Sequence, residues 1–312
     1  MDIVLWIVAV VGLLAGLTAA VIGRFYRIAF LRNKEEHADI NTLGKPWGAY
    51  LEQITEGIEW LQEKAAETAH IESFDGLRLF AWVVEQENAR GTVLMCHGYR
   101  SRGFLDFSCA FRFFYEQGLN LVVIEQRACG NSEGNIITFG IKESRDVSSW
   151  ANWVRERFGD QMPIILAGVS MGCTSVILSV ANGLPDNVAG IVADCGYTSA
   201  WRQLAHVLKR DYRLPPFPIL HLVNCLFKRR TGCDLRSFDT LSVLSGCDIP
   251  VLFVHGGADR FVPTDMSVEG WRACSADKDI LIVEGAAHAT SSIADPKQYQ
   301  RKVKAFLDNV LE

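Results

Sequence analysis

The sequence predicts an α/β fold built on one mostly parallel β-sheet that is covered by helices on both faces. Short apolar runs alternate with segments of helical periodicity over most of the 312 residues, and this alternation is typical of parallel sheets. Two strand-like runs come first, at residues 71–84, and the Asp-Gly pair between them is a strong hairpin signal. A Gly-x-Ser-x-Gly pattern at residues 168–172 then joins a buried run to a helical segment.

The amino-terminal segment differs sharply from the rest of the chain. Residues 3–23 carry no charge and consist mainly of Val, Leu, Ile and Ala, and this length allows an α-helix to cross a bilayer. A cleaved signal peptide would have basic residues before the apolar run, and a soluble core helix would keep a polar stripe. Those two alternatives fit less well, so a transmembrane helix is predicted over residues 1–23.

The flanks of this span predict its orientation. Basic residues follow it at positions 24, 27, 32 and 34, whereas an acidic residue precedes it. The positive-inside rule then places the remainder of the chain in the cytoplasm, attached to the cell membrane by a single pass. Gly12 and Gly16 form a G-x-x-x-G pattern inside the span, which would allow two such helices to pack closely in a homodimer, although small residues are common in membrane helices without one.

The remaining elements follow in order along the chain. A charged connector is expected over residues 24–46, and residues 47–61 have the apolar spacing of an amphipathic helix. After the hairpin we expect strands at residues 92–96, 121–124, 163–167, 189–193, 251–254 and 280–283. Helices are expected at residues 104–115 and 143–158, from residue 173 onward, and at residues 298–311. Residues 47–312 therefore form one domain.

One insertion interrupts the alternation between residues 197 and about 246. It contains an apolar, proline-broken stretch at residues 214–227, with three basic residues just before it and three just after it. A small helical cap packed on the core is the simpler interpretation. The alternative is a lid whose apolar surface lines a pocket or touches anionic lipid.

The composition of the chain argues against a nucleic-acid-binding protein, a disulfide-bonded protein and a zinc protein. The net charge of −5 gives no reason to expect a nucleic-acid partner. Nine cysteines are scattered without a C-x-x-C pair, which indicates free thiols in a reducing compartment rather than disulfides. The seven histidines show no spacing that would complete a zinc site with those cysteines. We therefore expect no metal and no cofactor.

The Gly-x-Ser-x-Gly pattern predicts a tight turn that would expose the hydroxyl of Ser170 as a nucleophile. In a strand–turn–helix context this pattern forms a nucleophile elbow, because side chains at Gly168 and Gly172 would collide with the neighbouring strand and helix. The pattern alone is weak, since a capping serine in a Gly-rich turn has the same letters. Its significance depends on whether a base and an acid stand where Ser170 needs them.

Two residues stand at such positions. Asp259 follows the strand at residues 251–254, and His288 follows the last strand. The order Ser, acid, His at the carboxyl ends of successive strands predicts a catalytic triad in which Ser170 attacks, His288 moves the proton and Asp259 orients His288. Asp194 is the alternative acid.

Two further histidines have structural interpretations. His97 follows a strand directly before Gly98, which indicates a role in the loop. His255 lies at the end of a strand and is expected to position the Asp259 loop. The oxyanion of a tetrahedral intermediate needs two N–H donors. We expect these donors to be the backbone N–H groups of Met171, at the start of the helix, and of Tyr99, after the strand that ends at residue 96.

The segments described so far resemble the α/β-hydrolases of the serine esterase and lipase type, over residues 71 to 311. They are His-Gly-Tyr at 97–99, Gly-Val-Ser-Met-Gly at 168–172, the Asp259 loop, and Gly-Ala-Ala-His at 285–288. Residues 125–134 are similar to the family's Asp-x-Arg-Gly-x-Gly-x-Ser-x-Gly loop, but Glu125 replaces Asp and Ala128 replaces Gly. Residues 194–199 resemble a segment of bacterial, often membrane-anchored members of the superfamily.

The resemblance implies an eight-stranded, mostly parallel sheet and metal-independent hydrolysis through an acyl-enzyme. We therefore expect a serine hydrolase that cleaves a carboxylic ester, either an acyl ester or a lipid-derived one, near the membrane. Thioester cleavage, acyl transfer to an alcohol and peptide hydrolysis use the same machinery and stay open, as does a non-catalytic, membrane-anchored scaffold.

Overall fold

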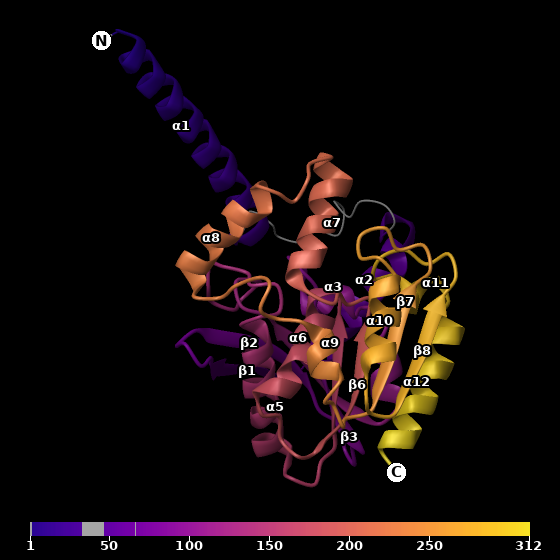
Figure 1. Cartoon of the computed structure of the whole chain (residues 1–312). Coiled ribbons are helices and arrows are strands. Elements are labelled where there is room, and N and C mark those ends of the chain that lie inside the picture. Colours follow the sequence, from indigo (N-terminus) through magenta and orange to yellow (C-terminus); the bar gives the residue numbers. More distant parts are fainter. Residues whose placement is uncertain (1, 33–46, 66) are drawn as a thin grey trace.

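The computed structural model describes residues 2–32, 47–65 and 67–312 of the chain (Figure 1). Its centre is an eight-stranded sheet in the order β1-β2-β4-β3-β5-β6-β7-β8. β1 pairs antiparallel with β2, and β2 with β4, while every other neighbouring pair is parallel. The strands are β1 Glu67–Glu72, β2 Arg78–Val84, β3 Gly91–Cys96, β4 Leu119–Glu125, β5 Ile164–Val169, β6 Val188–Asp194, β7 Val251–Gly256 and β8 Lys278–Val283. The eight-stranded, mostly parallel sheet expected from the sequence is confirmed.

Helices cover both faces of this sheet because the side chains of each central strand alternate between two cores. In β3, Val93 and Met95 join one core, and Leu94 and Cys96 join the other. Three helices supply side chains to the first core: α2 (Leu51–Lys64), α4 (Phe111–Glu116) and α12 (Pro296–Val310). Three others pack on the second: α5 (Glu143–Phe158), α6 (Met171–Ser179) and α9 (Thr240–Leu244). The remaining short helices are η2 Trp47–Tyr50, η3 Val180–Asn182, α10 Asp265–Ala273 and α11 Ser291–Ala294.

One predicted helix is broken in two. Residues 104–115 form α3 (Gly103–Asp106) and α4, separated by four residues of turn. α2 approaches this turn so closely at Gly57 that a Cβ there would collide with the backbone carbonyl of Ser108. The break also turns the carboxylate of Asp106 toward the backbone N–H of Gly98, at 2.6 Å. The continuous apolar spacing of this segment could not reveal contacts made by distant parts of the chain.

The amino-terminal helix is longer than the sequence predicts. α1 runs Asp2–Phe30, so residues 24–30 are helical rather than part of a connector; the rest of the predicted connector, residues 33–46, lies outside the described residues. Ile22, Tyr26 and Phe30 are buried, one turn apart, whereas Arg24 and Arg27 are exposed. The arginines end the apolar run, but the helix continues because this stripe packs on the domain.

α1 is long and apolar enough to cross a membrane. The most apolar 18-residue stretch within residues 3–30 has a mean hydropathy of 2.5, and this stretch is not buried against the domain. Gly12 and Gly16 lie in this exposed part, with no atom near the position of a Cβ. The homodimer through these glycines remains a prediction. Figure 1 shows α1 projecting from the end of the molecule at which α7 (Ala200–Tyr212) and α8 (Ile219–Thr231), the helices of the insertion, also lie.

Candidate active site

Ser170 occupies a sharp, strained turn between β5 and α6. Its φ of 55° and ψ of −114° lie outside the regions that a serine prefers. Its N–H donates to the carbonyl of Asp194 at 2.8 Å, which ties the turn to the neighbouring strand. A Cβ on Gly168 would collide with the backbone of Gly172, and a Cβ on Gly172 would collide with the carbonyl of Cys96. Glycine is therefore required on both sides of the serine.

The three side chains named from the sequence lie in contact. His288 Nε2 is 2.9 Å from Ser170 Oγ, and His288 Nδ1 is 2.6 Å from Asp259 Oδ2. Ser170 and Asp259 are buried, while the imidazole of His288 keeps 20% of its surface exposed. With Nδ1–H donating to the carboxylate, Nε2 has a lone pair for the serine hydroxyl. This arrangement can transfer the serine proton to the imidazole during nucleophilic attack.

The carboxylate of Asp259 is held in its ionised form. Burial alone would raise its pKa, but hydrogen bonds from His255 and His288 outweigh burial and keep the pKa well below its ordinary value. The other carboxylate oxygen accepts N–H bonds from Phe261 at 2.8 Å and Val262 at 3.0 Å. His255 Nε2 lies 3.1 Å from Asp259 Oδ2 and its Nδ1 lies 2.7 Å from Ser267 Oγ. His255 therefore positions the Asp259 loop, as the sequence indicates.

Asp194, the alternative acid, has a different environment. It is buried at the end of β6, and its Oδ1 has no hydrogen-bond partner among the described residues. Burial raises the pKa of its carboxyl to about 7, although the charge of His255 opposes the shift. A carboxyl group that stays protonated near neutral pH is poorly suited to orient an imidazolium. Asp259, rather than Asp194, contacts His288.

Asp194 should make the folded protein less stable as the pH rises. The carboxyl ionises in the unfolded chain above about pH 4 but stays neutral in the folded protein until about pH 7. The stability that this group contributes is complete below pH 4 and is lost as the pH approaches 7. An Asp194→Asn variant, which cannot ionise, should show a smaller fall in unfolding free energy between pH 5 and pH 8, by on the order of 3 kcal/mol. Urea titrations at both pH values measure this, and an unchanged difference between them would contradict the prediction.

The loop after β3 approaches Ser170 closely. A Cβ on Gly98 would lie 3.3 Å from the Cβ of Ser170, so a larger residue would crowd the serine. Tyr99 follows, and its hydroxyl donates to backbone carbonyls of α1. Met171 is the first residue of α6, where backbone N–H groups have no carbonyl partner within the helix. Both residues flank the site as the sequence predicts, and their roles as oxyanion donors remain predictions.

His97 and Asp106 shape this loop without contacting Ser170 in any hydrogen bond of the described residues. His97 Nε2 accepts the N–H of Gln126 at 2.9 Å, and its Nδ1 donates to the carbonyl of Gly98 at 2.7 Å. Burial lowers the pKa of His97 to about 4, so it is neutral and structural. The role of Asp106 was not predicted from the sequence. Its contact to Gly98 spans eight residues and has no motif that could have identified it.

The two departures from the family's loop at residues 125–134 are accommodated. Ala128 takes a φ of 60°, a left-handed conformation that the family's glycine adopts without strain. The carboxylate of Glu125 is fully buried and accepts a hydrogen bond from the guanidinium of Arg102 at 2.8 Å. Its other oxygen accepts the backbone N–H of Asn131. The longer Glu side chain therefore closes the loop on itself.

An apolar cavity of about 180 Å³ opens beside Ser170. Its walls come from α1, α7 and α8 and from aromatic side chains of the domain. The lining residues are Phe25, Ile28, Ala29, Phe30, Tyr99, Phe139, Ser170, Tyr197, Gln203, Leu204, Val207, Leu208, Tyr212, Ile219, Leu220, Val223 and Phe261. The helices of the insertion therefore line a pocket, as the lid interpretation of the sequence expects.

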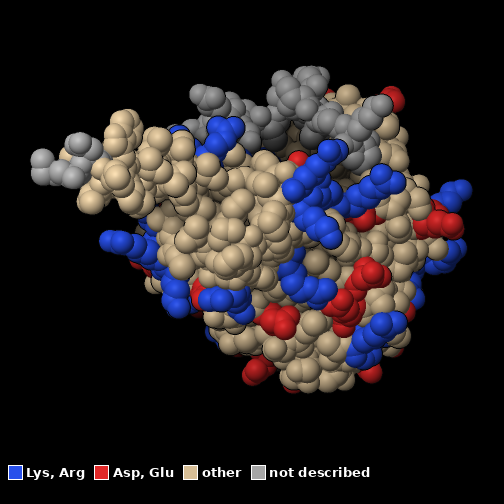
Figure 2. All heavy atoms as spheres, turned by 45° about the horizontal axis from the view of Figure 1, so that its top comes forward, with Lys and Arg blue, Asp and Glu red and all other residues tan. Residues whose placement is uncertain are grey.

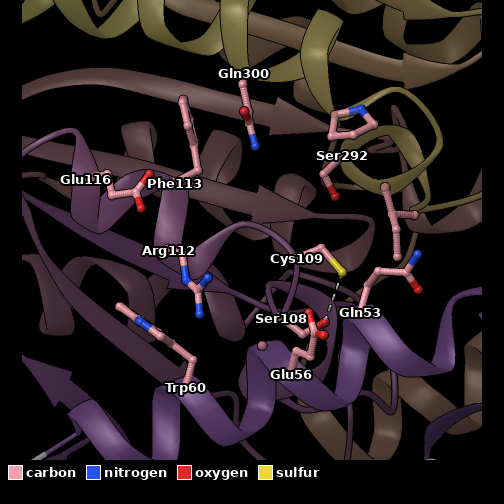
Figure 3. A pocket seen from close by; sticks show the side chains of 13 residues that line it. Gln53, Glu56, Trp60, Ser108, Cys109, Arg112, Phe113, Glu116, Ser292 and Gln300 are labelled. Atoms are coloured by element: carbon pink, nitrogen blue, oxygen red, sulfur yellow. Dashed lines mark hydrogen bonds between the residues drawn. The ribbon is translucent and has the colours of Figure 1, made fainter.

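A second hollow of about 280 Å³ lies between α2, α4 and the segment of α11 and α12. Figure 3 shows Arg112 and Glu116 of α4, and Cys109 of the preceding turn, among the side chains that line it. Burial raises the pKa of the Cys109 thiol, so this sulfur is a poor nucleophile. Ser170, Asp259 and His288 do not line this hollow, and the proposed chemistry does not use it.

One cluster of potential metal ligands is present within residues 67–312. It consists of Cys195, Asp259 and His288, whose ligand atoms lie within 4.8 Å of one another. Burial raises the pKa of the Cys195 thiol well above its ordinary value, which opposes the thiolate that a metal requires. Asp259 and His288 are already hydrogen-bonded to each other. These donors therefore fit a hydrogen-bonded triad better than a metal centre.

Comparison with known proteins gives related results at the levels of sequence and structure. Residues 91–226 match the family model of the α/β hydrolase fold. The uncharacterized protein YqkD of Bacillus subtilis is 27% identical over 240 residues, which cover 77% of this chain and 78% of that protein. The uncharacterized membrane protein YNL320W of Saccharomyces cerevisiae is 25% identical over 226 residues, which cover 71% and 72%.

Solved structures share the fold at lower sequence identity. The esterase Pf2001 of Pyrococcus furiosus superposes with a TM-score of 0.66 at 20% identity, covering 79% of this chain and 91% of that one. Est1E of Butyrivibrio proteoclasticus, solved with ferulic acid bound, superposes with a TM-score of 0.62 at 17% identity, covering 78% and 99%. Together with the topology of the sheet, these matches show that the chain has the α/β-hydrolase fold and is similar in structure to esterases with that fold.

Proposed function

We propose that the protein is a membrane-anchored serine hydrolase that cleaves carboxylic esters of acyl or lipid-derived substrates through an acyl-enzyme. The single observation that carries this proposal is the chain of contacts from Ser170 Oγ through His288 to Asp259, at 2.9 and 2.6 Å. The esterase neighbours support the same reaction class. The apolar cavity beside Ser170 favours an acyl chain over a peptide.

The reaction proceeds in two halves. Ser170 Oγ attacks the ester carbonyl while its proton passes to His288 Nε2, and the new imidazolium is stabilised by the Asp259 carboxylate. The N–H groups of Met171 and Tyr99 donate to the oxyanion. The intermediate collapses, the alcohol leaves with the proton from His288, and the acyl group stays on Ser170. Water then attacks this acyl-enzyme with His288 as the base, and the carboxylic acid is released.

The location proposed for this reaction is the cytoplasmic face of the cell membrane. α1 is the anchor, and the basic residues that follow its apolar part favour an internal carboxyl-terminal domain. One relative is itself named as a membrane protein. A tag at the carboxyl terminus should accordingly be protected from protease in intact cells.

A fluorophosphonate probe tests the proposed nucleophile. The probe should label the wild-type protein at Ser170 and should leave a Ser170→Ala variant unlabelled, because only an activated serine attacks phosphorus at a useful rate. Peptide mass mapping locates the label. A Ser149→Ala variant serves as a matched control, since this serine is exposed on α5 and bonds within its own helix. Labelling of the Ser170→Ala variant would contradict the assignment of Ser170 as the nucleophile.

A further inference from the structure

We propose that the carboxyl-terminal turns of α1 form a wall of the acyl-binding pocket, so that the substrate is a fatty acyl ester resident in the membrane. The inference rests on the proposed function and names its substrate class. The helix that anchors the domain would then also select the acyl chain. A tether that merely attached the domain to the membrane would have no such effect.

The first support is the position of α1 in the pocket. Phe25, Ile28, Ala29 and Phe30 line the same cavity as Ser170. Phe30 is fully buried and packs against Phe227 of α8, with ring centroids 4.6 Å apart and ring planes tilted by 39°. The end of α1 is therefore part of the wall that faces the nucleophile.

Hydrogen bonds fix this part of α1 to the domain. Tyr99 Oη donates to the carbonyl of Ala29 at 2.9 Å, and the guanidinium of Arg100 donates to the carbonyls of Ile28 and Leu31 at 2.8 Å each. These bonds satisfy carbonyls at the helix end, which otherwise lack partners. Beyond the helix, Arg32 donates from its backbone to Asn135 at 2.9 Å. The carboxyl-terminal end of α1 is therefore held directly against the loop beside Ser170.

The second support is the surface around the pocket. Phe25 meets Tyr212 of α7 edge to face, with ring centroids 5.1 Å apart. The connection from α7 to α8 begins at Tyr212, and its Phe217 has 70% of its surface exposed. Basic residues lie beside this connection at positions 209, 210 and 213, and three more, at positions 228–230, lie in the last turn of α8. Figure 2 shows Lys and Arg side chains on the face from which α1 projects.

This combination suits the interface of an anionic membrane. Exposed aromatic side chains enter the headgroup layer, and the basic residues around them pair with lipid phosphates. The outer part of α1 is long enough to span the bilayer. α1, α7 and α8 lie at the same end of the molecule (Figure 1), and residues of these three helices line the pocket. An acyl chain can pass from the lipid into the pocket without crossing water.

The volume of the cavity also limits the length of acyl chain that it can hold. Its volume of about 180 Å³ is similar to that of an engineered apolar cavity of about 150 Å³ that accepts benzene. It therefore holds roughly the first six to eight carbons of an acyl chain, and the rest of a longer chain would extend toward the lipid. A short acyl group, such as acetyl, would leave most of the wall untouched.

Acyl-chain selectivity of the full-length protein in anionic proteoliposomes tests the inference. Ala29→Phe places a ring at the pocket wall and should lower kcat/KM for p-nitrophenyl dodecanoate at least about tenfold more than it lowers kcat/KM for p-nitrophenyl acetate. Ala20→Phe is the matched control, because the same substitution at this exposed position of the same helix lies outside the pocket. Phe25→Ala removes a ring from the wall and should raise the ratio of dodecanoate to acetate turnover.

The outcomes separate this inference from the proposed function. Equal losses on both esters, or an unchanged chain-length profile in Ala29→Phe and Phe25→Ala, would overturn the role of α1 while leaving the hydrolase assignment intact. Wild-type protein that labels with fluorophosphonate but hydrolyses acetate and not dodecanoate would overturn the substrate class. Failure of labelling and of every ester would instead refute the proposed function. Stoichiometric fluorophosphonate labelling of each variant confirms that its site is folded.

Discussion

Replacing His288 with alanine should lower kcat for ester hydrolysis by roughly 10⁵- to 10⁶-fold, because Ser170 then has no base to take its proton. The reason lies in the 2.9 Å contact between His288 Nε2 and Ser170 Oγ. Steady-state turnover of p-nitrophenyl acetate measures the loss. His70→Ala is the control and should keep full activity, since this histidine is exposed on the edge strand β1.

A double variant sharpens the same prediction. If Ser170 and His288 act as one unit, Ser170→Ala combined with His288→Ala should be no slower than either single variant. The residual rate then comes from substrate binding and the oxyanion donors alone. Losses that multiply would show that the two residues act independently, and that result would contradict a triad.

Replacing Asp259 with asparagine should lower kcat by roughly 10⁴-fold without disturbing the geometry. The Asp259 carboxylate accepts hydrogen bonds from the imidazoles of both His255 and His288. The amide NH₂ of asparagine cannot accept a hydrogen bond from the Nδ1–H group of His288, so the imidazole takes the other tautomer. Nε2 then carries the proton and cannot receive another from Ser170.

The His255→Phe variant distinguishes two roles of this part of the site: the orientation of His288 by Asp259, and the support of the Asp259 loop by His255. It removes one donor to Asp259 but leaves the 2.6 Å contact between Asp259 and His288 available. A much smaller loss of kcat is expected, together with a lower thermal midpoint because the Asp259 loop loses a buried tie. An Asp259→Asn enzyme with wild-type turnover would exclude Asp259 as the orienting acid. Retained activity in Asp194→Asn would support the choice between the two carboxylates.

The contacts among the three predicted residues could be anticipated from strand ends. Ser170 and Asp259 each follow a buried apolar strand and His288 follows the edge strand β8, and parallel strands bring their carboxyl ends to one edge of a sheet. Every residue of β3 is buried, with side chains alternating between the two cores, and this explains why such a run is apolar throughout. Local sequence patterns suffice here because the parallel topology converts order along the chain into proximity.

Contacts between distant segments were beyond such patterns. The bond from Asp106 to Gly98 depends on a break between α3 and α4 that no local signal marks. The extension of α1 to Phe30 depends on partners in α8, about 200 residues away in the chain, so the arginines at 24 and 27 suggested an early end. At both places, packing against distant segments, rather than the local helix propensity of the residues, decides where the helix ends.

The sequence by itself determined the α/β class, the apolar amino-terminal helix, and the serine and histidine, Ser170 and His288, that meet an acid at the sheet edge. These features follow from periodicity, from the length of apolar runs and from the requirement for glycine beside Ser170. Only the tertiary structure decided which carboxylate contacts His288 and that the end of α1 lines the pocket beside Ser170. Both depend on side chains from separate elements meeting in space, and no property of a local segment specifies its distant neighbour.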